Sequence, residues 1–147
     1  MNSVKEVVDR GLQAWRTHDR EAFAACYSDG AVISAPGDHE AHGKEGARAF
    51  MSTWVDAFPD NELTIEREYV VGNVLVQEGT FAGTHTGNLV TPDGQVIQPT
   101  GRSVRAAYAD VFAVDGGLVT SEHLYFDRLE LLTQIGVLPS TAATASV

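Results

Sequence analysis

Residues 47–59 read ARAFMSTWVDAFP and carry the pattern from which the fold can be predicted. Apolar side chains stand at positions 47, 50, 51, 54, 55 and 58, which is the spacing of a single helix face. Pro59 ends this helix because proline lacks a backbone N–H and its ring clashes with the preceding turn. The apolar face holds three aromatic residues and a methionine, so an equally wide surface must cover it, and we expect a sheet.

The chain before this segment predicts two more helices. Ser3 and Glu6 have the spacing of a capping box, in which each side chain satisfies a backbone N–H at the helix start. The apolar residues that follow recur at helical spacing: Val4, Val7, Val8, Leu12 and Trp15. Asp19 is expected to cap a short second helix. A turn over residues 28–30, a short strand over 31–34 and a loop over 36–43 are predicted next.

The chain after Pro59 predicts strands. Residues 63–71 alternate, with Leu63, Ile65, Tyr69 and Val71 on one face and Thr64, Glu66 and Glu68 on a solvated face. Gly72-Asn73 forms a hairpin turn, and further strands are predicted over residues 74–86, 104–114 and 118–126, with a closing helix over 128–134. This order defines the α+β class: three N-terminal helices packed in a strongly bent antiparallel sheet that encloses a pocket. One domain should cover residues 1–139, followed by a flexible tail over 140–147.

Composition excludes several classes of partner. The 147 residues include 10 Lys and Arg against 20 Asp and Glu, a formal charge of −10, which argues against nucleic acid and against an anionic membrane surface. No apolar stretch approaches a membrane span, and the N-terminus lacks the apolar region of a signal peptide. Cys26 is a lone cysteine and is interpreted as buried filler. We therefore expect a cytoplasmic protein.

Motifs for cofactor or nucleophile chemistry are absent from the sequence: no GxxxxGK[ST], CxxC, HExxH or G-x-S-x-G occurs. Residues 38–42 contain metal-ligand residue types but lack a fixed third partner, so no metal site is predicted there. We expect no cofactor, and any catalysis has to rest on His, Asp, Glu, Tyr and Arg.

The last predicted strand offers the most suggestive set of such residues. Alternation places His123, Tyr125 and Asp127 on one face, and Glu122, Leu124 and Phe126 on the other. Either face could point inward. The polar face would suit a pocket, whereas Asp127 is also positioned to do no more than cap the helix that begins at residue 128.

Strand register indicates which residues would gather on the polar face, and both interpretations of Asp127 stay open. A two-residue turn at Asp115-Gly116 would place His123 opposite Tyr108 and Tyr125 opposite Ala106. The surface then gathers Tyr108, Asp110, His123, Tyr125 and Asp127, with Phe112 beside them. A longer turn would oppose Glu122 to Asp110, a like-charge pair that costs energy, so the shorter turn is preferred.

His85 lies between Gly83 and Gly87, and glycines around a strand histidine indicate close backbone approach or a ligand. The alternative is a surface histidine on a strand weakened by glycine. Four aromatic residues on the predicted helices are candidates for the core, for the pocket lining or for both: Trp15, Tyr27, Phe50 and Trp54. With Tyr108, Asp110 and Phe112 they form the predicted substrate-binding set.

The order of several motifs resembles one family. The motifs are Tyr27-Ser28-Asp29-Gly30, Phe58-Pro59-Asp60, Gly83-Thr84-His85-Thr86-Gly87, Pro99-Thr100-Gly101-Arg102 and Tyr125-Phe126-Asp127 leading to Leu131–Gly136. Together they are similar to the SnoaL-like polyketide (ester) cyclases of the nuclear transport factor 2-like superfamily, over residues 4–138.

The resemblance implies a cone of bent sheet around a long helix, a deep pocket, and a homodimer joined through the sheet. In the characterised cyclases an aspartate on the last strand is the general acid/base of a cofactor-free intramolecular aldol closure, and Asp127 is the matching residue. His85 is a weaker match. A His/Gln-type pair that the cyclases usually carry on the preceding strand has no clear counterpart in residues 106–112.

These observations predict a cofactor-independent acid/base enzyme of secondary metabolism that acts on a small apolar carbonyl substrate, foremost a polyketide-type cyclase. Asp127 would take a proton α to the carbonyl, with His123 or Tyr108 on the enolate oxygen and His85 or Tyr125 protonating the attacked ketone. The alternatives are an isomerase, a hydrolase or a lyase such as a dehydratase in the same pocket, and a protein that binds a small ligand without catalysis.

Overall fold

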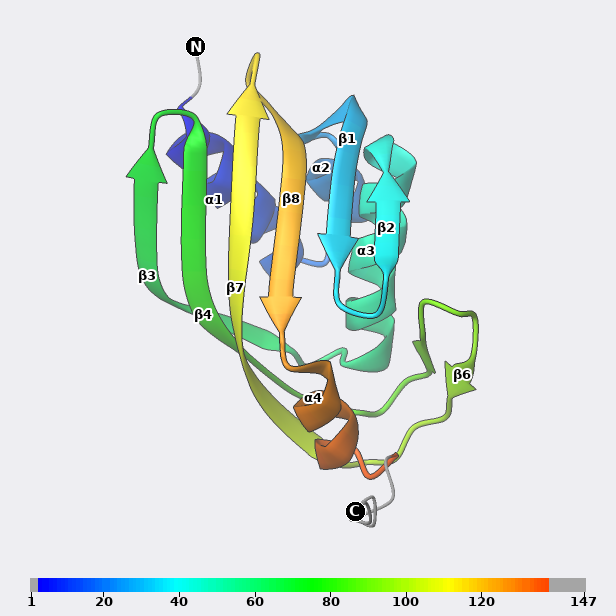
Figure 1. The fold of residues 1–147 in the computed structure, drawn as a ribbon. Helices are drawn as coiled ribbons and strands as arrows, with labels where there is room; N and C mark the ends of the chain where they lie inside the picture. The colour runs from blue at the N-terminus through cyan, green and yellow to red at the C-terminus, as the bar shows by residue number, and fades with distance from the viewer. Residues whose placement is uncertain (1–2, 138–147) are drawn as a thin grey trace.

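The computed structural model describes residues 3–137 and contains four helices and eight strands in that range (Figure 1). The helices are α1 (Val4–Arg16), α2 (Arg20–Ala24), α3 (Gly43–Ala57) and α4 (Arg128–Gln134). The strands are β1 (Tyr27–Ala35), β2 (His39–His42), β3 (Glu62–Val71), β4 (Val74–Thr84), β5 (Leu89–Val90), β6 (Val96–Ile97), β7 (Ser103–Asp115) and β8 (Leu118–Phe126). The predicted tail over residues 140–147 lies outside the described residues.

Six of the strands form one curved sheet in the order β2-β1-β8-β7-β4-β3, and β5 pairs with β6 separately. The α+β class is confirmed, and α1, α2 and α3 all lie against one face of the sheet, which stays open (Figure 1). One pair differs from the antiparallel expectation, because β1 and β8 run parallel. Turn signals specify hairpins between neighbouring strands, whereas the pairing of β1 with β8 joins distant segments and depends on how the helices fold back.

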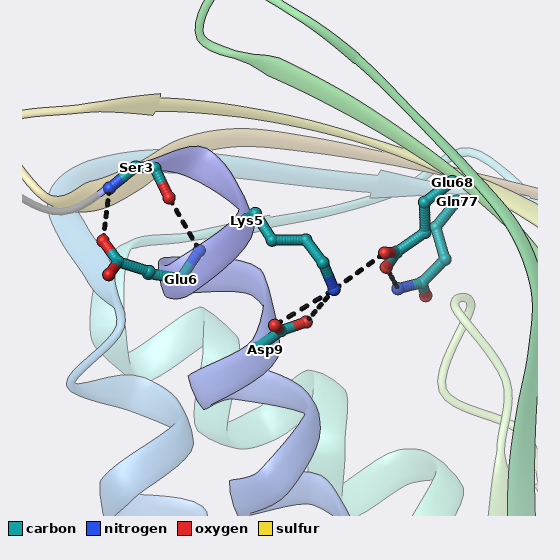
Figure 2. A network of polar contacts seen from close by, with 6 residues as sticks. All are labelled: Ser3, Lys5, Glu6, Asp9, Glu68 and Gln77. Atoms are coloured by element: carbon teal, nitrogen blue, oxygen red, sulfur yellow. Dashed lines mark hydrogen bonds and ion pairs between the residues drawn. The ribbon is translucent and has the colours of Figure 1, made fainter.

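The predicted helix caps are present. Glu6 N donates to Ser3 Oγ at 3.2 Å and Ser3 N donates to Glu6 Oε1 at 2.8 Å, the two bonds of the capping box (Figure 2). The side chain of Asp19 accepts from Ala22 N at 3.0 Å and begins α2. These bonds satisfy backbone donors that a helix start otherwise leaves free.

The wide apolar face of α3 packs into the core as its spacing predicted. Ala47, Phe50, Met51 and Val55 are buried in the main cluster with residues of α1, β1 and the sheet. Phe58, at the end of α3, is buried in a second cluster with Leu131 and Ile135 from the C-terminal segment. Full burial of side chains of this size contributes roughly 1.5–3 kcal/mol each, so α3 is the main apolar anchor of the sheet.

Two short segments near β1 differ from expectation. The predicted turn at residues 28–30 lies inside β1, whose pairing with β8 shifts register between Tyr27 and Val32. The predicted loop at residues 36–43 contains β2, which pairs antiparallel with β1. Strand β4 ends at Thr84, so His85 and Thr86 lie beyond it. Local turn residues did not reveal these features because pairing with β8 and β1 holds the segments extended.

A bulge in β3 overturns the predicted alternation of that strand. Ile65 pairs with Gly79 and Arg67 pairs with Glu78, so Glu66 is an extra residue without a partner. Beyond the bulge each side chain changes face. Glu68, predicted on a solvated face, is therefore turned to the helix side, where its side chain is only 18% exposed.

Within residues 3–137, no helix combines the length and the hydropathy needed to cross a membrane.

Candidate active site

A cavity lies between the helices and the inner face of the curved sheet, with a volume of about 100 Å³. For comparison, an engineered cavity of about 150 Å³ binds benzene. Its walls come from α1 and α3 on one side and from β4, β7 and β8 on the other. The walls are mostly aromatic and aliphatic, with five residues that bear hydroxyl, amide or carboxyl groups on the sheet side: Tyr27, Gln77, Tyr108, Asp110 and Glu122.

The register of β7 and β8 decides which side chains reach this cavity, and the predicted register is wrong. The hairpin turns at Gly116-Gly117 with Asp115 opposite Leu118, and a bulge then shifts the pairing between Ala113 and Val114. Relative to the prediction, the turn and the bulge together move the strand pairing by an odd number of residues. An odd shift exchanges the two faces of β8 relative to those of β7. Tyr108 pairs with Phe126, not with His123.

The inner face of β8 is consequently the face of Glu122, Leu124 and Phe126, all of which line the cavity. His123 lies on the outer face, where its Nδ1 is 2.6 Å from Ser34 Oγ. Tyr125 is 59% exposed and lies beside the β1–β2 hairpin. Neither side chain is part of the cavity wall, because alternation along β8 turns both away from it.

Asp127 also lies outside the cavity wall. Its side chain is exposed and accepts a hydrogen bond from Glu130 N at 3.0 Å, as the N-cap of α4. Of the two interpretations that the sequence left open, the structure shows the helix cap. Contact of Asp127 with a substrate has no support in this geometry.

His85 is fully buried just beyond the end of β4, and it does not line the cavity. Thr100 N donates to its Nδ1 at 3.2 Å, and its ring lies 5.4 Å from that of Phe58. Burial lowers the pKa of His85, so the ring is held neutral, with its proton on Nε2. Thr86 N and Gly87 N donate to Ala57 O at 3.2 and 3.1 Å. Gly87 therefore allows the backbone of this segment to approach the end of α3 closely.

The seven predicted substrate-binding residues all line the cavity: Trp15, Tyr27, Phe50, Trp54, Tyr108, Asp110 and Phe112. Their aromatic rings pack on one another, with the rings of Trp15 and Phe50 6.2 Å apart and those of Trp54 and Phe126 5.5 Å apart. Contact with a substrate stays a prediction for each of them. The structure shows that these aromatic rings and the aliphatic side chains of the cavity wall surround its carboxyl, amide and hydroxyl groups.

Two carboxylic acids meet inside this enclosure. Asp110 is 7% exposed and Glu122 is 2% exposed, and they are diagonal neighbours on the inner face of β7 and β8. The hydroxyl of Tyr27 donates to Glu122 Oε1, whereas Asp110 Oδ1 has no hydrogen-bond partner among the described residues. Burial, and then the charge of Glu122, raises the pKa of Asp110 well above its ordinary value. The pair is therefore suited to hold one proton between two acids.

Tyr108 completes the polar group of the cavity. Its hydroxyl donates to Gln77 Oε1 at 3.0 Å, and Gln77 is only 4% exposed. Burial and the nearby charges of Asp110 and Glu122 raise the pKa of Tyr108, and burial followed by Glu122 raises the pKa of Tyr27. Both phenols therefore stay protonated at neutral pH.

Glu122 and Gln77 were not among the predicted site residues. The sequence prediction disfavours the longer turn that opposes Glu122 to Asp110, because a like-charge pair costs energy. Inside an apolar cavity one acid takes up a proton, so that objection does not hold. A signal was present, since a glutamate that shares a strand face with Leu124 and Phe126 indicates a buried acid.

Metal binding receives no support from the described part of the chain. Between residues 3 and 137 no group of three or more His, Cys, Asp or Glu side chains is arranged to hold an ion. His42 and Glu40 approach each other at 3.2 Å on an exposed strand, without a third ligand.

The buried acid Asp110 gives a prediction for stability. An unfolded aspartate titrates near pH 3.9, whereas the folded-state pKa is higher, so the native state binds the proton more tightly between the two values. The free energy of unfolding is then lost as pH rises through the folded pKa. Asp110→Asn removes this pH dependence. The free energy of unfolding of the variant, relative to that of the wild type, should therefore be higher at pH 8 than at pH 5.

Urea denaturation at both pH values measures this difference in stability. The matched control is Asp115→Asn, at the exposed end of β7, which should change stability equally at the two pH values. An equal effect of Asp110→Asn at pH 5 and pH 8 would mean that Asp110 is charged and tolerated in the folded protein.

Comparison with known proteins places this fold in a family. The model of the family described as SnoaL-like polyketide cyclase matches residues 5–135, most of the chain. No curated protein shows significant similarity.

Several solved structures share the fold. AclR of Streptomyces galilaeus, described as a candidate hydroxylase, superposes with a TM-score of 0.76 at 22% identity, over 92% of this chain and 97% of that one. TsrD of Streptomyces laurentii superposes with a TM-score of 0.76 at 26% identity, over 92% of this chain and 96% of that one. IdmH of Streptomyces antibioticus, described as a candidate polyketide cyclase, superposes with a TM-score of 0.74 at 20% identity, over 92% of this chain and 100% of that one. With the sequence match and the curved sheet in agreement, the chain belongs to the SnoaL-like polyketide cyclase family.

Proposed function

We propose that this protein is a cofactor-independent acid/base enzyme that closes a ring in a small, mostly apolar carbonyl compound by intramolecular aldol condensation. The observation that carries the proposal is the pair of buried acids, Asp110 and Glu122, in an otherwise apolar cavity. Family membership and the likeness to a candidate polyketide cyclase support the reaction class.

The hydrogen bonds around the two acids suggest a division of roles. Tyr27 donates to Glu122, which stabilises a negative charge there, whereas Asp110 Oδ1 receives no donor from the described residues. Glu122 is thus the base and Asp110 the acid. This assignment replaces Asp127, whose position at the start of α4 supports a cap.

The reaction then balances without any other reactant. Glu122 takes the proton α to one carbonyl, and the enolate carbon attacks the second carbonyl of the same molecule. The new alkoxide takes the proton of Asp110, and the proton on Glu122 passes to Asp110 to restore the starting state. Acid/base steps of this kind contribute about 10²–10⁴-fold, and holding the two ends of one molecule together contributes up to roughly 7–11 kcal/mol more.

An isomerase would use the same pair, since moving a proton between two carbons needs one base and one acid. Both reactions begin with removal of an α-proton. A protein that only binds its ligand would not catalyse that step. The first test therefore addresses proton removal and not the final product.

The test follows deuterium exchange at the α-carbon of small aryl ketones in D₂O, by proton NMR. Acetophenone, 1-indanone and 2-tetralone probe a cavity that accommodates about one ring. The wild type should accelerate exchange of at least one of them above the buffer rate. Exchange at the buffer rate for the whole panel, with binding to the cavity demonstrated, would favour the ligand-binding alternative.

A homodimer joined through the sheet is also part of the proposal. The face of β4 and β7 opposite the cavity carries small apolar side chains: Val76, Ala107, Ala109, Val111 and Ala113. No helix in residues 3–137 covers this face (Figure 1). These apolar side chains, interspersed on β4 with Glu78 and Thr80, give a face suited to packing against a second sheet.

Light scattering tests the assembly. The wild type should have twice the mass of the chain, and Val111→Glu should shift it toward the monomer because the charge would be buried at the centre of the contact. Gln13→Glu, on the exposed side of α1, is the matched control and should leave the mass unchanged. A monomeric wild type would contradict the proposed dimer.

A further inference from the structure

A chain of polar contacts runs from Lys5 and Asp9 on the surface of α1 to Glu68 and Gln77 on the sheet (Figure 2). Lys5 Nζ lies 2.8 Å from Asp9 Oδ1 and 2.9 Å from Glu68 Oε1. Glu68 Oε2 accepts from Gln77 Nε2 at 3.1 Å, and Gln77 Oε1 accepts from the hydroxyl of Tyr108 at 3.0 Å. The chain thus links an exposed ion pair to a phenol in the cavity wall.

The chemistry of each member fixes the direction of the hydrogen bonds. Hydrogen bonds to Asp9 and Glu68 raise the pKa of Lys5, so its ammonium stays charged and donates to both carboxylates. An ionised carboxylate only accepts, so the amide of Gln77 has to present its NH₂ to Glu68 and its oxygen to Tyr108. That oxygen also only accepts, and the proton of Tyr108 is therefore committed to Gln77.

The backbone supports this arrangement at two points. The bulge at Glu66 is what turns Glu68 inward, opposite Gln77, and bulges commonly re-aim side chains beside functional sites. Gly79 leaves room for the phenol, since a Cβ there would lie 2.9 Å from Tyr108 Oη and 2.5 Å from Thr64 O. The bulge and Gly79 both make the sheet less regular, and both help to place the hydroxyl of Tyr108.

From these contacts we propose that Glu68, acting through Gln77, is a positioning residue that makes Tyr108 a hydrogen-bond acceptor toward the cavity. The hydroxyl of Tyr27 is committed to Glu122 in the same way. The two phenols then offer only lone pairs to a ligand, and the cavity selects ligands whose polar group donates a proton at this position, such as an alcohol or an enol. The inference rests on the proposed function only in taking this cavity as the ligand site.

The first experiment needs no ligand. With ¹³Cζ-labelled tyrosine, assigned through Tyr108→Phe, the Tyr108 signal reports whether its hydroxyl donates. The signal should move in Glu68→Ala and in Gln77→Leu. It should stay in place in Glu68→Gln, whose amide oxygen can still accept from Gln77, and in Glu66→Ala, the exposed control at the bulge.

The second experiment compares 1-phenylethanol with acetophenone, which share a carbon skeleton and differ in having or lacking a donor. In calorimetric titrations the ratio of the two dissociation constants should favour the alcohol in the wild type. The preference should fall about fivefold or more in Glu68→Ala and Gln77→Leu, and it should be kept in Glu68→Gln and Glu66→Ala. Near-ultraviolet circular dichroism checks that each variant is folded.

The outcomes separate the two proposals. An unmoved Tyr108 signal in Glu68→Ala, or a ligand preference that Gln77→Leu leaves unchanged, overturns the positioning role. Failure of both probes to bind the wild type counts against the proposed ligand site, while the carbon signal still decides the role of Glu68. Equal changes in Glu66→Ala and Glu68→Ala would also overturn it, because they would show a general effect of the bulge.

Discussion

Glu122→Gln is expected to lower the rate of α-proton exchange by about 10²–10⁴-fold, the range that general acid/base groups contribute. Glutamine keeps the shape of the side chain and can still accept from Tyr27, so the cavity should survive. What is lost is the carboxylate that would take the proton. The measurement is the exchange rate of whichever ketone in the panel the wild type turns over, compared at equal saturation.

Asp127 provides the matched control for this prediction. Asp127→Asn should exchange at the wild-type rate and with unchanged stability, because asparagine caps helices as well as aspartate does. Asp127→Ala should lose about 1 kcal/mol of stability with the loss of the bond from Glu130 N, again with the exchange rate unchanged. If Asp127→Asn lost activity and Glu122→Gln kept it, the catalytic assignment to the buried pair would be wrong.

Gly87→Ala is expected to destabilise the fold by about 3 kcal/mol or more, at the upper end of overpacking effects. A Cβ at this position would lie 1.8 Å from the backbone oxygen of Asp56, at the end of α3. Two backbone donors of this segment bond to Ala57 O, so it cannot move away without losing them. The melting temperature should fall by roughly 6–12 °C, at about 2–4 °C per kcal/mol for a domain of this size.

Gly30→Ala is the control for this substitution. Gly30 lies in β1, where an added Cβ would have nothing within 4 Å, and alanine there should change stability by no more than about 0.5 kcal/mol. Similar melting temperatures for the two variants would show that the segment around Gly87 can shift. The glycine of this motif would then have a role other than close packing.

The sequence alone determined most of the elements. The apolar spacing of residues 47–59 predicted α3, the Ser3 and Glu6 pair predicted the start of α1, and Gly72-Asn73 predicted the β3–β4 hairpin. Strand β8 and helix α4 have the predicted bounds. These features depend on side chains and backbone groups within a few residues of one another, so their energetics are visible in the local sequence.

The site was only half predictable, for a reason that lies in the sheet. The aromatic lining followed from apolar faces of helices, and Tyr108, Asp110 and Phe112 followed from alternation along one strand. The choice between Asp127 and Glu122 depended on register, where a shift of one residue exchanges the two faces. The register was predicted from the turn residues, and these do not indicate the bulge that sets it.

The sequence by itself determined which residue types could do chemistry, because it lacks cofactor and nucleophile motifs and leaves His, Asp, Glu, Tyr and Arg. The tertiary structure decided which of them share an apolar enclosure. Two bulges turned Glu122 and Glu68 inward. The helices then closed over Glu122 and Asp110 and removed water from both carboxyl groups. That burial gives the pair its capacity to share a proton, since desolvation depends on everything that surrounds a group and not on its neighbours along the chain.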